Sequence, residues 1–193
     1  MDVIGHFITI TKHKKLVMKS CFKVGLYKQG LLHDLSKYTP VEFITGTKFY
    51  QGYRSPNTAE RELYGYSGAW LHHKGRNKHH FEYWIDYSPG ANPTLQGNKM
   101  PTRYVVEMFL DRIAASKTYL GDKYTDKCPL EYFLRSREYY LIHEDTMELL
   151  EKLLSRLAMD GEEKTLLYIR EKVLAHKRKL NIFQRISWLL KVL

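Results

Sequence analysis

The sequence predicts an all-α fold, a single domain of about seven to nine helices that spans residues 1–193. Two observations support this class. Apolar residues recur at spacings of three and four along most of the chain, which is the period of an amphipathic helix. Helix start signals, such as Ser-Pro and Thr-Pro, precede several of these stretches, whereas the polar-apolar alternation of strands is scarce.

The N-terminal part predicts two helices joined by a bend. Residues 6–28 form the first expected helix, and Gly30 permits a bend after it. The next helix is expected to begin at Thr39, which can cap it, with Pro40 in the first turn. Glu42 stands three residues after Thr39, so the two side chains can form a capping box.

The middle of the chain predicts two further helices and a long loop. A helix is expected from Pro56 to His73, and Gly75 is suited to end it. A short helix is expected over residues 78–84. Residues 88–100 contain glycine, proline and amides without any period, which is typical of a loop that could cover a substrate.

The C-terminal part predicts four helices. Pro101 opens one of them, and three additional helices are expected within residues 129–193. The clearest covers residues 144–159, where leucines recur at helical spacing. Residues 181–193 are amphipathic and basic, so they could dock on the domain, form a homodimer contact or lie on a membrane surface.

Composition limits the functional class only loosely. The formal charge of +10 favours anionic partners, such as phosphorylated small molecules, nucleotides or, less strongly, nucleic acid. No apolar run reaches the roughly 18–20 residues of a transmembrane helix, and the N-terminus lacks a secretory signal pattern. Cys21 and Cys128 are too few for a disulfide scaffold, so a cytoplasmic protein is expected.

The residues that could carry chemistry are histidines and aspartates. His33 and Asp34 are adjacent, and two histidine pairs follow at 72–73 and 79–80. Asp111 falls on the inward face of its expected helix, where a carboxylate needs a partner ion or a metal. Imidazole nitrogens with carboxylate oxygens suit iron, manganese and zinc, so one or two divalent transition-metal ions are expected.

In this order along the chain, the candidates resemble a known superfamily. His13, His33-Asp34, the histidine cluster and Asp111 are similar to the H…HD…H…H…D arrangement of the HD-domain metal-dependent phosphohydrolases. Residues 31–37 resemble the HD-x-x-K stretch of the HD-GYP branch, in which the lysine lies close to the substrate phosphate. Residues 72–84 are similar to an uncharacterised bacterial and phage family of small HD-like proteins.

The resemblance implies an HD-like metal-binding core over residues 10–120, with residues 129–193 outside it. It implies that Lys37 lies close to the substrate phosphate. For hydrolysis we expect catalytic roles for Asp34, Lys37 and His72, and substrate contacts for Lys37, Arg76 and Lys78. Which of the four clustered histidines point inward stays open. The implied metal ligands are His13, His33, Asp34, His73, His79, His80 and Asp111.

The resemblance favours hydrolysis of a small phosphate ester or a nucleotide. Three alternatives stay open: a di-iron oxygenase on the same scaffold, a non-catalytic metal- or nucleotide-binding regulatory module, and nucleic-acid binding through the basic ends. Asp111 could also form a buried ion pair with Arg103 or Arg112 instead of holding a metal.

Overall fold

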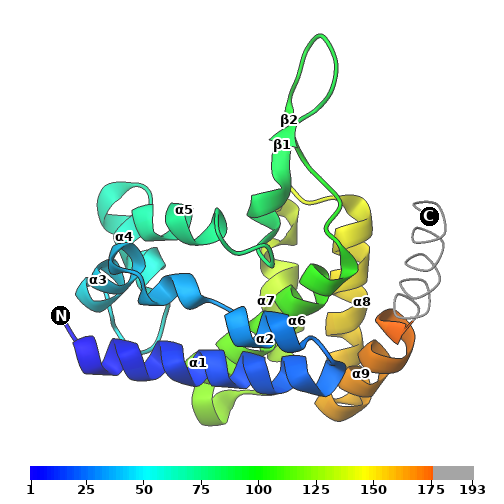
Figure 1. Cartoon of the computed structure of the whole chain (residues 1–193), viewed down its shortest axis with the longest axis horizontal. Helices are drawn as coiled ribbons and strands as arrows, with labels where there is room; N and C mark the ends of the chain where they lie inside the picture. The colour runs from blue at the N-terminus through cyan, green and yellow to red at the C-terminus, as the bar shows by residue number, and fades with distance from the viewer. Residues whose placement is uncertain (176–193) are drawn as a thin grey trace, which may run out of the picture.

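A computed structural model describes residues 1–175 as a body of helices from which a short hairpin projects (Figure 1). The predicted all-α class is confirmed, with nine α-helices in this part of the chain. The amphipathic segment 181–193 lies outside the described residues. The helices are α1 (Val3–Val24), α2 (Tyr27–Leu32), α3 (Pro40–Lys48), α4 (Pro56–Tyr64), α5 (Gly68–Lys74), α6 (Thr102–Leu120), α7 (Cys128–Ser136), α8 (Glu144–Asp160) and α9 (Glu162–Tyr168).

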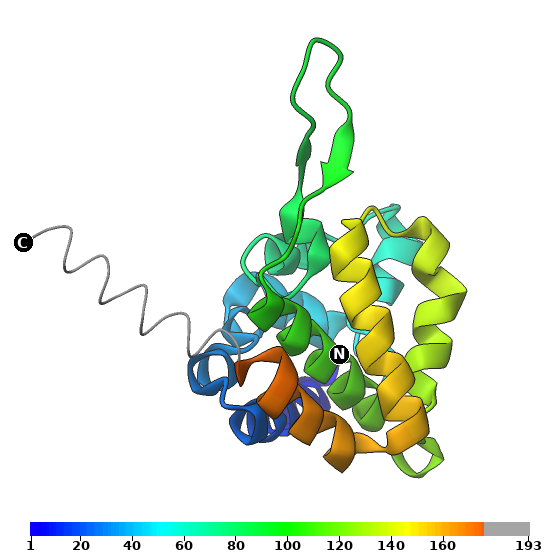
Figure 2. The same ribbon diagram turned by 90° about the vertical axis from the view of Figure 1, so that its right-hand side faces the viewer.

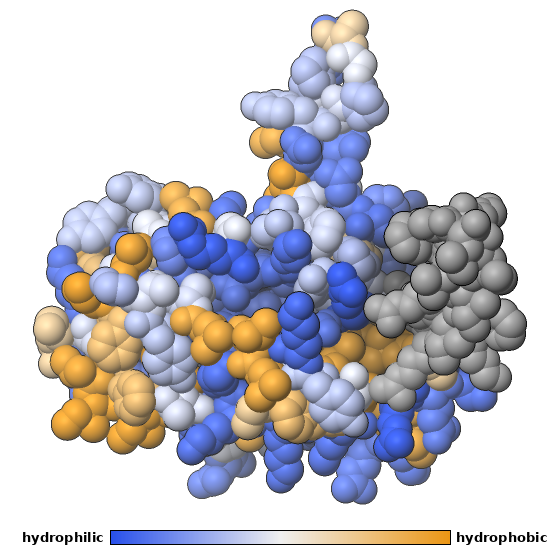
Figure 3. Space-filling view, viewed as in Figure 1, coloured by the Kyte–Doolittle hydropathy of each residue, from blue (hydrophilic) through white to orange (hydrophobic). Residues whose placement is uncertain are grey.

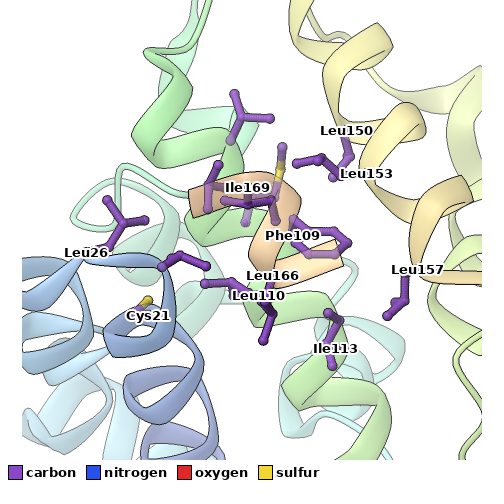
Figure 4. Packing of buried hydrophobic residues seen from close by; sticks show 14 of the residues in the cluster. Cys21, Leu26, Phe109, Leu110, Ile113, Leu150, Leu153, Leu157, Leu166 and Ile169 are labelled. Atoms are coloured by element: carbon purple, nitrogen blue, oxygen red, sulfur yellow. The ribbon is translucent and has the colours of Figure 1, made fainter. Parts of the chain in front are cut away.

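Helix α6 lies at the centre, with α1 packed on one side and α7 and α8 on another (Figures 1 and 2). One cluster of buried apolar side chains joins these helices to α9 (Figure 4). Leu150, Leu153, Leu154 and Leu157 of α8 are all fully buried in it, as their helical spacing predicted. The central position of α6 makes it a rigid base for the polar residues on its other face.

The expected helix from Pro56 to His73 is two helices, α4 and α5. Gly65 separates them with a left-handed backbone (φ 79°), and its amide closes α4 by bonding the Arg61 carbonyl. Glycine adopts this conformation without the strain that a side chain adds. The first helix likewise ends at Val24, earlier than expected, and α2 follows as a separate short helix.

The expected helix over residues 78–84 is only a 3₁₀ turn, Phe81–Trp84. Part of the expected loop is a hairpin of strands β1 (Ile85–Tyr87) and β2 (Leu95–Gly97), in which Ile85 pairs with Gly97. Figure 2 shows the hairpin standing away from the helices. Strands of three residues are too short to produce a recognisable alternation, which is why the pattern missed them.

Gly30 lies inside α2, so it does not provide the expected bend. A Cβ atom there would lie 2.9 Å from the Cys21 Cβ and 3.2 Å from the Met18 backbone, both on α1. The absence of a side chain therefore lets the two helices approach closely. This contact brings His33 and Asp34, which follow α2, beside α1.

Apolar side chains also remain exposed at one end of the molecule, over the beginning of α1 and over α3 (Figure 3). They include Ile4, Phe7 and Ile8 on α1 and Val41 and Ile44 on α3. Within residues 1–175, no helix combines the length and the apolar character that crossing a bilayer requires.

The close approach at Gly30 predicts that Gly30→Ala destabilises the protein. An added methyl group must push α2 away from α1, and overpacking of this kind costs about 1–3 kcal/mol. Gly68→Ala is a matched control, because its Cβ would meet Glu60 Oε1 at an ordinary 3.7 Å. Urea unfolding followed by circular dichroism measures both variants. Equal stability of the two would contradict this role of Gly30.

Candidate metal centre

Asp34 occupies an unusual turn directly after α2. Its backbone is left-handed (φ 53°), and among residues 1–175 it is the single non-glycine residue with a positive φ. That conformation costs about 1–2 kcal/mol for most side chains. Lys14 supports the turn, because its ammonium donates to the carbonyls of Leu31 (2.8 Å) and His33 (2.7 Å). The turn buries the Asp34 carboxylate, which is 2% exposed.

One group of possible ligands surrounds Asp34 Oδ2. His13 Nε2, from α1, lies 3.6 Å from this oxygen, and His33 Nε2 lies 3.3 Å from it. Asp111, from α6, completes the group, since its Oδ1 lies 2.9 Å from His13 Nε2 and 3.5 Å from His33 Nε2. These four residues offer four ligand atoms to one point.

A second group surrounds the other oxygen, Asp34 Oδ1. His73 Nε2, from α5, lies 3.3 Å from it, and His79 Nε2 lies 3.4 Å from it. His80 Nε2 lies 2.9 Å from His73 Nε2. The second group therefore also offers four ligand atoms, and Asp34 belongs to both groups through different oxygens.

The spacing of these atoms fits metal coordination. Ligand atoms that share one ion at about 2.0–2.2 Å lie about 2.8–3.6 Å apart in tetrahedral or octahedral geometry. Buried polar atoms normally have a hydrogen-bond partner. Here five buried atoms make no hydrogen bond of good geometry, namely both Asp34 oxygens and the Nε2 atoms of His13, His33 and His79. Two of the five do have close ion-pair contacts, Asp34 Oδ2 with Lys37 and His13 Nε2 with Asp111. All five face the centre of the two groups.

Glu107 of α6 orients two of the histidines. Its Oε1 lies 3.0 Å from His33 Nδ1 and 3.3 Å from His79 Nδ1. A carboxylate that accepts the Nδ1–H leaves the Nε2 lone pair of each ring free for a cation. The carboxylate itself is 4% exposed, so these two rings are its main compensation for lost hydration.

Glu42 of α3 has the same role for the second group. Its Oε2 lies 2.7 Å from His73 Nδ1, and its Oε1 lies 2.6 Å from His72 Nδ1. The expected capping box with Thr39 is therefore wrong: Glu42 is buried and bonds to histidines, and the Thr39 side chain makes no capping bond. Burial of Glu42 links α3 to α5.

The cluster gathers acidic and basic side chains in a small buried volume. Its four carboxylates, Asp34, Glu42, Glu107 and Asp111, face one lysine ammonium, whose Nζ (Lys37) lies 2.6 Å from Asp34 Oδ2. Burial alone would raise the pKa of Asp34, but His33 and Lys37 hold that pKa well below its ordinary value. Ionised carboxylates need cations at this depth.

Each ligand group contains histidines whose pKa shifts in opposite directions: the pKa is raised for His33, His73 and His79 and lowered for His13 and His80. Burial alone would lower the pKa of His33, but the Asp34 carboxylate and its neighbours raise it well above the ordinary value. Burial and the adjacent rings of His79 and His73 instead lower the pKa of His80. The His80 ring is thus held neutral, the form that can ligate a metal.

A cavity of about 810 Å³ opens beside the cluster. Helices α1, α3, α4, α6 and α7 contribute to its wall. Five of the candidate site residues line it, namely His13, Lys37, His73, His80 and Asp111. The volume is in the range of small-molecule sites. A ligand in this cavity would contact the edge of both groups.

Three sequence-based expectations do not match the geometry. His72 lies outside both groups and outside the cavity lining, because its ring turns to Glu42. Arg76 and Lys78 are exposed and do not line the cavity; Arg76 donates to the His72 carbonyl. The alternative partners of Asp111 are also wrong, since it contacts histidines and not arginines.

Comparison with known proteins places the chain in a family. A family model described as "Family of unknown function (DUF5662)" matches residues 2–156. The chain belongs to the DUF5662 family. No curated protein and no solved structure matches it. The matched span contains both ligand groups of this DUF5662 chain, together with Glu42, Glu107 and α7.

The two orienting carboxylates were missed in the sequence of this DUF5662 chain. Glu107 stands four residues before Asp111 on α6, so the two share one face of that helix. That spacing was a usable signal, because an inward glutamate next to an inward aspartate needs an explanation. Glu42 gave a misleading signal, because its spacing from Thr39 also fits a capping box.

His6 provides a test of the cavity wall by pH. Its ring packs on Phe43 and Tyr50, its Nδ1 is buried without a partner, and burial together with the Lys37 charge lowers its pKa to about 4. Below pH 6.5 the unfolded chain takes up a proton that the folded protein resists until about pH 4. Stability from this residue is therefore present above pH 6.5 and lost as the pH falls.

We expect the wild type to lose on the order of 1–3 kcal/mol of unfolding free energy relative to His6→Phe between these pH values. The phenylalanine keeps a ring in the same space without an ionisable group. Denaturant unfolding across the pH series measures the difference, in which the other histidines cancel. Parallel pH profiles for the two proteins would rule out the neutral His6.

Proposed function

We propose that this DUF5662 chain is a metal-dependent phosphohydrolase that acts on a small phosphate ester or nucleotide with two divalent ions. One observation carries the proposal. Asp34 offers one oxygen to each of two four-atom ligand groups, and the groups border a cavity with basic side chains in its wall. A carboxylate shared in this way is typical of two-metal sites that act on phosphates.

The donor chemistry supports iron, manganese or zinc. Each group combines imidazole nitrogens with carboxylate oxygen. Iron, manganese and zinc bind such mixed ligand sets, whereas calcium and magnesium prefer oxygen ligands alone. Asp34 Oδ1 and the Nε2 atoms of His33 and His79 are buried without hydrogen-bond partners, and a cation at this point would satisfy them. When bound, such ions would lower the pKa of a water and neutralise phosphate oxygens.

The protein side chains have separate roles in this proposal. Glu107 and Glu42 hold His33, His79 and His73 with Nε2 turned to the ligand position. Lys37 lies beside Asp34 and reaches the cavity, where its ammonium can bind an oxygen of the transferred phosphoryl group. His72, which does not reach the cavity, has no part in it.

The order of the ligands supports the resemblance to HD-domain phosphohydrolases. His13, His33-Asp34, a histidine cluster and Asp111 are the residues that the two groups contain, in the chain order that the resemblance implied. Both cysteines are free thiols, so we place this activity in the cytoplasm. The proposed substrate is anionic, as the net charge of +10 favours.

Metal analysis of protein purified without chelators tests the proposal. We expect about two ions per chain, as in two-metal hydrolases, and hydrolysis of para-nitrophenyl phosphate that requires added Mn²⁺, Fe²⁺ or Zn²⁺. Asp34→Asn should lose both properties, because an amide offers one oxygen where the carboxylate offers two. Asp86→Asn, an exposed aspartate of β1, is the control.

Two outcomes would contradict this function. Well under one ion per chain, with no uptake of added metal, would remove the metal centre. An iron-loaded protein that consumes oxygen and leaves phosphate esters intact would favour the oxygenase alternative.

The role of Glu107 gives a separate prediction for metal affinity. Glu107→Gln replaces the carboxylate oxygen that faces both Nδ1 atoms by a neutral amide oxygen, which is a weaker acceptor and no longer raises the basicity of the two rings. Loss of such an orienting carboxylate lowers metal affinity about 10–100-fold. Competition with a chromogenic chelator measures it. Glu148→Gln, an exposed glutamate of α8, should match the wild type; equal affinity for Glu107→Gln would exclude the orienting role.

A further inference from the structure

The wall of the cavity carries more positive than negative charge. Six basic residues line it, and two of these have carboxylate partners: Lys37 pairs with Asp34, and Arg54 with Glu62. In the part of the chain that the structure describes, the other four form no ion pair. Those four are Arg61, Arg112, Lys123 and Arg135. These four side chains are therefore available to bind an anionic ligand in the cavity.

Arg112 differs from the other three because it is partly buried and held in place. Its guanidinium lies over the rings of Phe133 (5.9 Å) and Tyr140 (5.5 Å). Its one side-chain hydrogen bond is long, 3.5 Å to Tyr140 Oη, and its Nε is buried without a partner. Tyr140 itself is fixed by a 2.6 Å bond with Ser136 Oγ. The guanidinium is thus held in position, but most of its N–H donors lack a hydrogen-bond acceptor within residues 1–175.

Partial burial of the Arg112 guanidinium costs free energy unless a ligand supplies hydrogen-bond acceptors for it. A guanidinium removed from water loses hydration, and aromatic rings replace only part of that loss. Its planar set of donors matches the two oxygens of a phosphate or a carboxylate. Among the described residues no carboxylate lies within ion-pair distance of Arg112. An oxyanion that enters the cavity can therefore supply the partner that the described residues do not.

The position of Arg112 relates this oxyanion to the metal groups. Arg112 directly follows Asp111 on α6, so the two side chains leave the helix about 100° apart. Both line the same cavity. A molecule that places one phosphate at the ligand groups and Lys37 can thus extend along the cavity wall to Arg112.

We propose that Arg112 binds a second anionic group of the substrate, so that the cavity selects a phosphate ester bearing a further phosphate or carboxylate over a simple monophosphate. This inference rests on the proposed function for the reacting phosphate. The binding of the second group needs only Arg112 and the cavity. Its recognition can therefore be measured without turnover.

Calorimetric titration with two matched pairs of ligands tests the proposal. Fructose bisphosphate against fructose monophosphate probes a second phosphate, and phosphogluconate against sorbitol phosphate probes a carboxylate. The proteins are wild type, Arg112→Gln, Arg112→Lys and, as control, Arg103→Gln. Arg103 also lies on α6 and over a ring, but it is exposed and does not line the cavity. Each titration is run with Mn²⁺ and after chelation.

We expect the wild type to bind the doubly anionic member of at least one pair about tenfold or more tightly, as a charge-assisted bidentate contact gives. The pair that shows the preference identifies the second group as phosphate or carboxylate. Arg112→Gln should abolish the preference with unchanged affinity for the monophosphate and unchanged metal content. Arg112→Lys keeps a cation over the rings but loses the paired N–H donors of the guanidinium, so it should retain only part of the preference for the doubly anionic ligand. Arg103→Gln should behave as wild type.

The remaining outcomes either overturn the proposal or separate it from the proposed function. No preference in the wild type, an unchanged preference in Arg112→Gln, or equal weakening of both members of a pair would overturn the proposal. A preference that depends on Arg112 and persists after chelation supports it even if the protein holds no metal and hydrolyses nothing. In that case the proposed function fails and the anion site stands.

Discussion

The burial of one carboxylate, that of Asp34, is the constraint on which the rest of the site depends. A left-handed turn after α2 places it between α1, α5 and α6, where water cannot solvate it. Each oxygen then needs its own set of partners, and histidines from α1, α5 and the turns after α2 and α5 surround the two oxygens separately. The close contact of α2 with α1 at Gly30 keeps the turn at this point. The helical body is thus arranged around a group that its interior does not favour.

The carboxylates of Glu42 and Glu107 are also buried and also need partners. Glu107 bonds to the Nδ1 atoms of His33 and His79, and Glu42 to that of His73, while the Nε2 atoms of the same rings face Asp34. A network of this kind is stable only when all its members are satisfied. Here the innermost atoms are not satisfied by the chain itself. Departures from ordinary packing rules are expected at functional sites, because function and not stability determines them.

The cavity shows that the helices after residue 128 are more than an addition to a metal-binding core. Tyr132 and Arg135 of α7 line it, and Phe133 and Tyr140 support Arg112. The resemblance to HD-domain proteins reached only residues 10–120, which contain the candidate ligands and Arg112 but not the part of the wall that α7 provides. The ligand groups and the cavity wall therefore have separate roles. In the proposed function, the ligand groups would act on the phosphate, and the cavity wall would select the molecule that carries it.

The sequence by itself determined the all-α class, because helical periodicity is a local property. It also predicted His33, Asp34 and Asp111 as ligands from adjacency and an inward helix face, and the resemblance added His13. Only the tertiary structure decided between His72 and His73, since adjacent residues on a helix point about 100° apart and either could face inward. It also revealed Glu42, Glu107 and Arg112. Glu42 meets His73 across 31 positions, and Glu107 meets His33 across 74. Contacts at such separations arise from packing between helices, which no local pattern encodes.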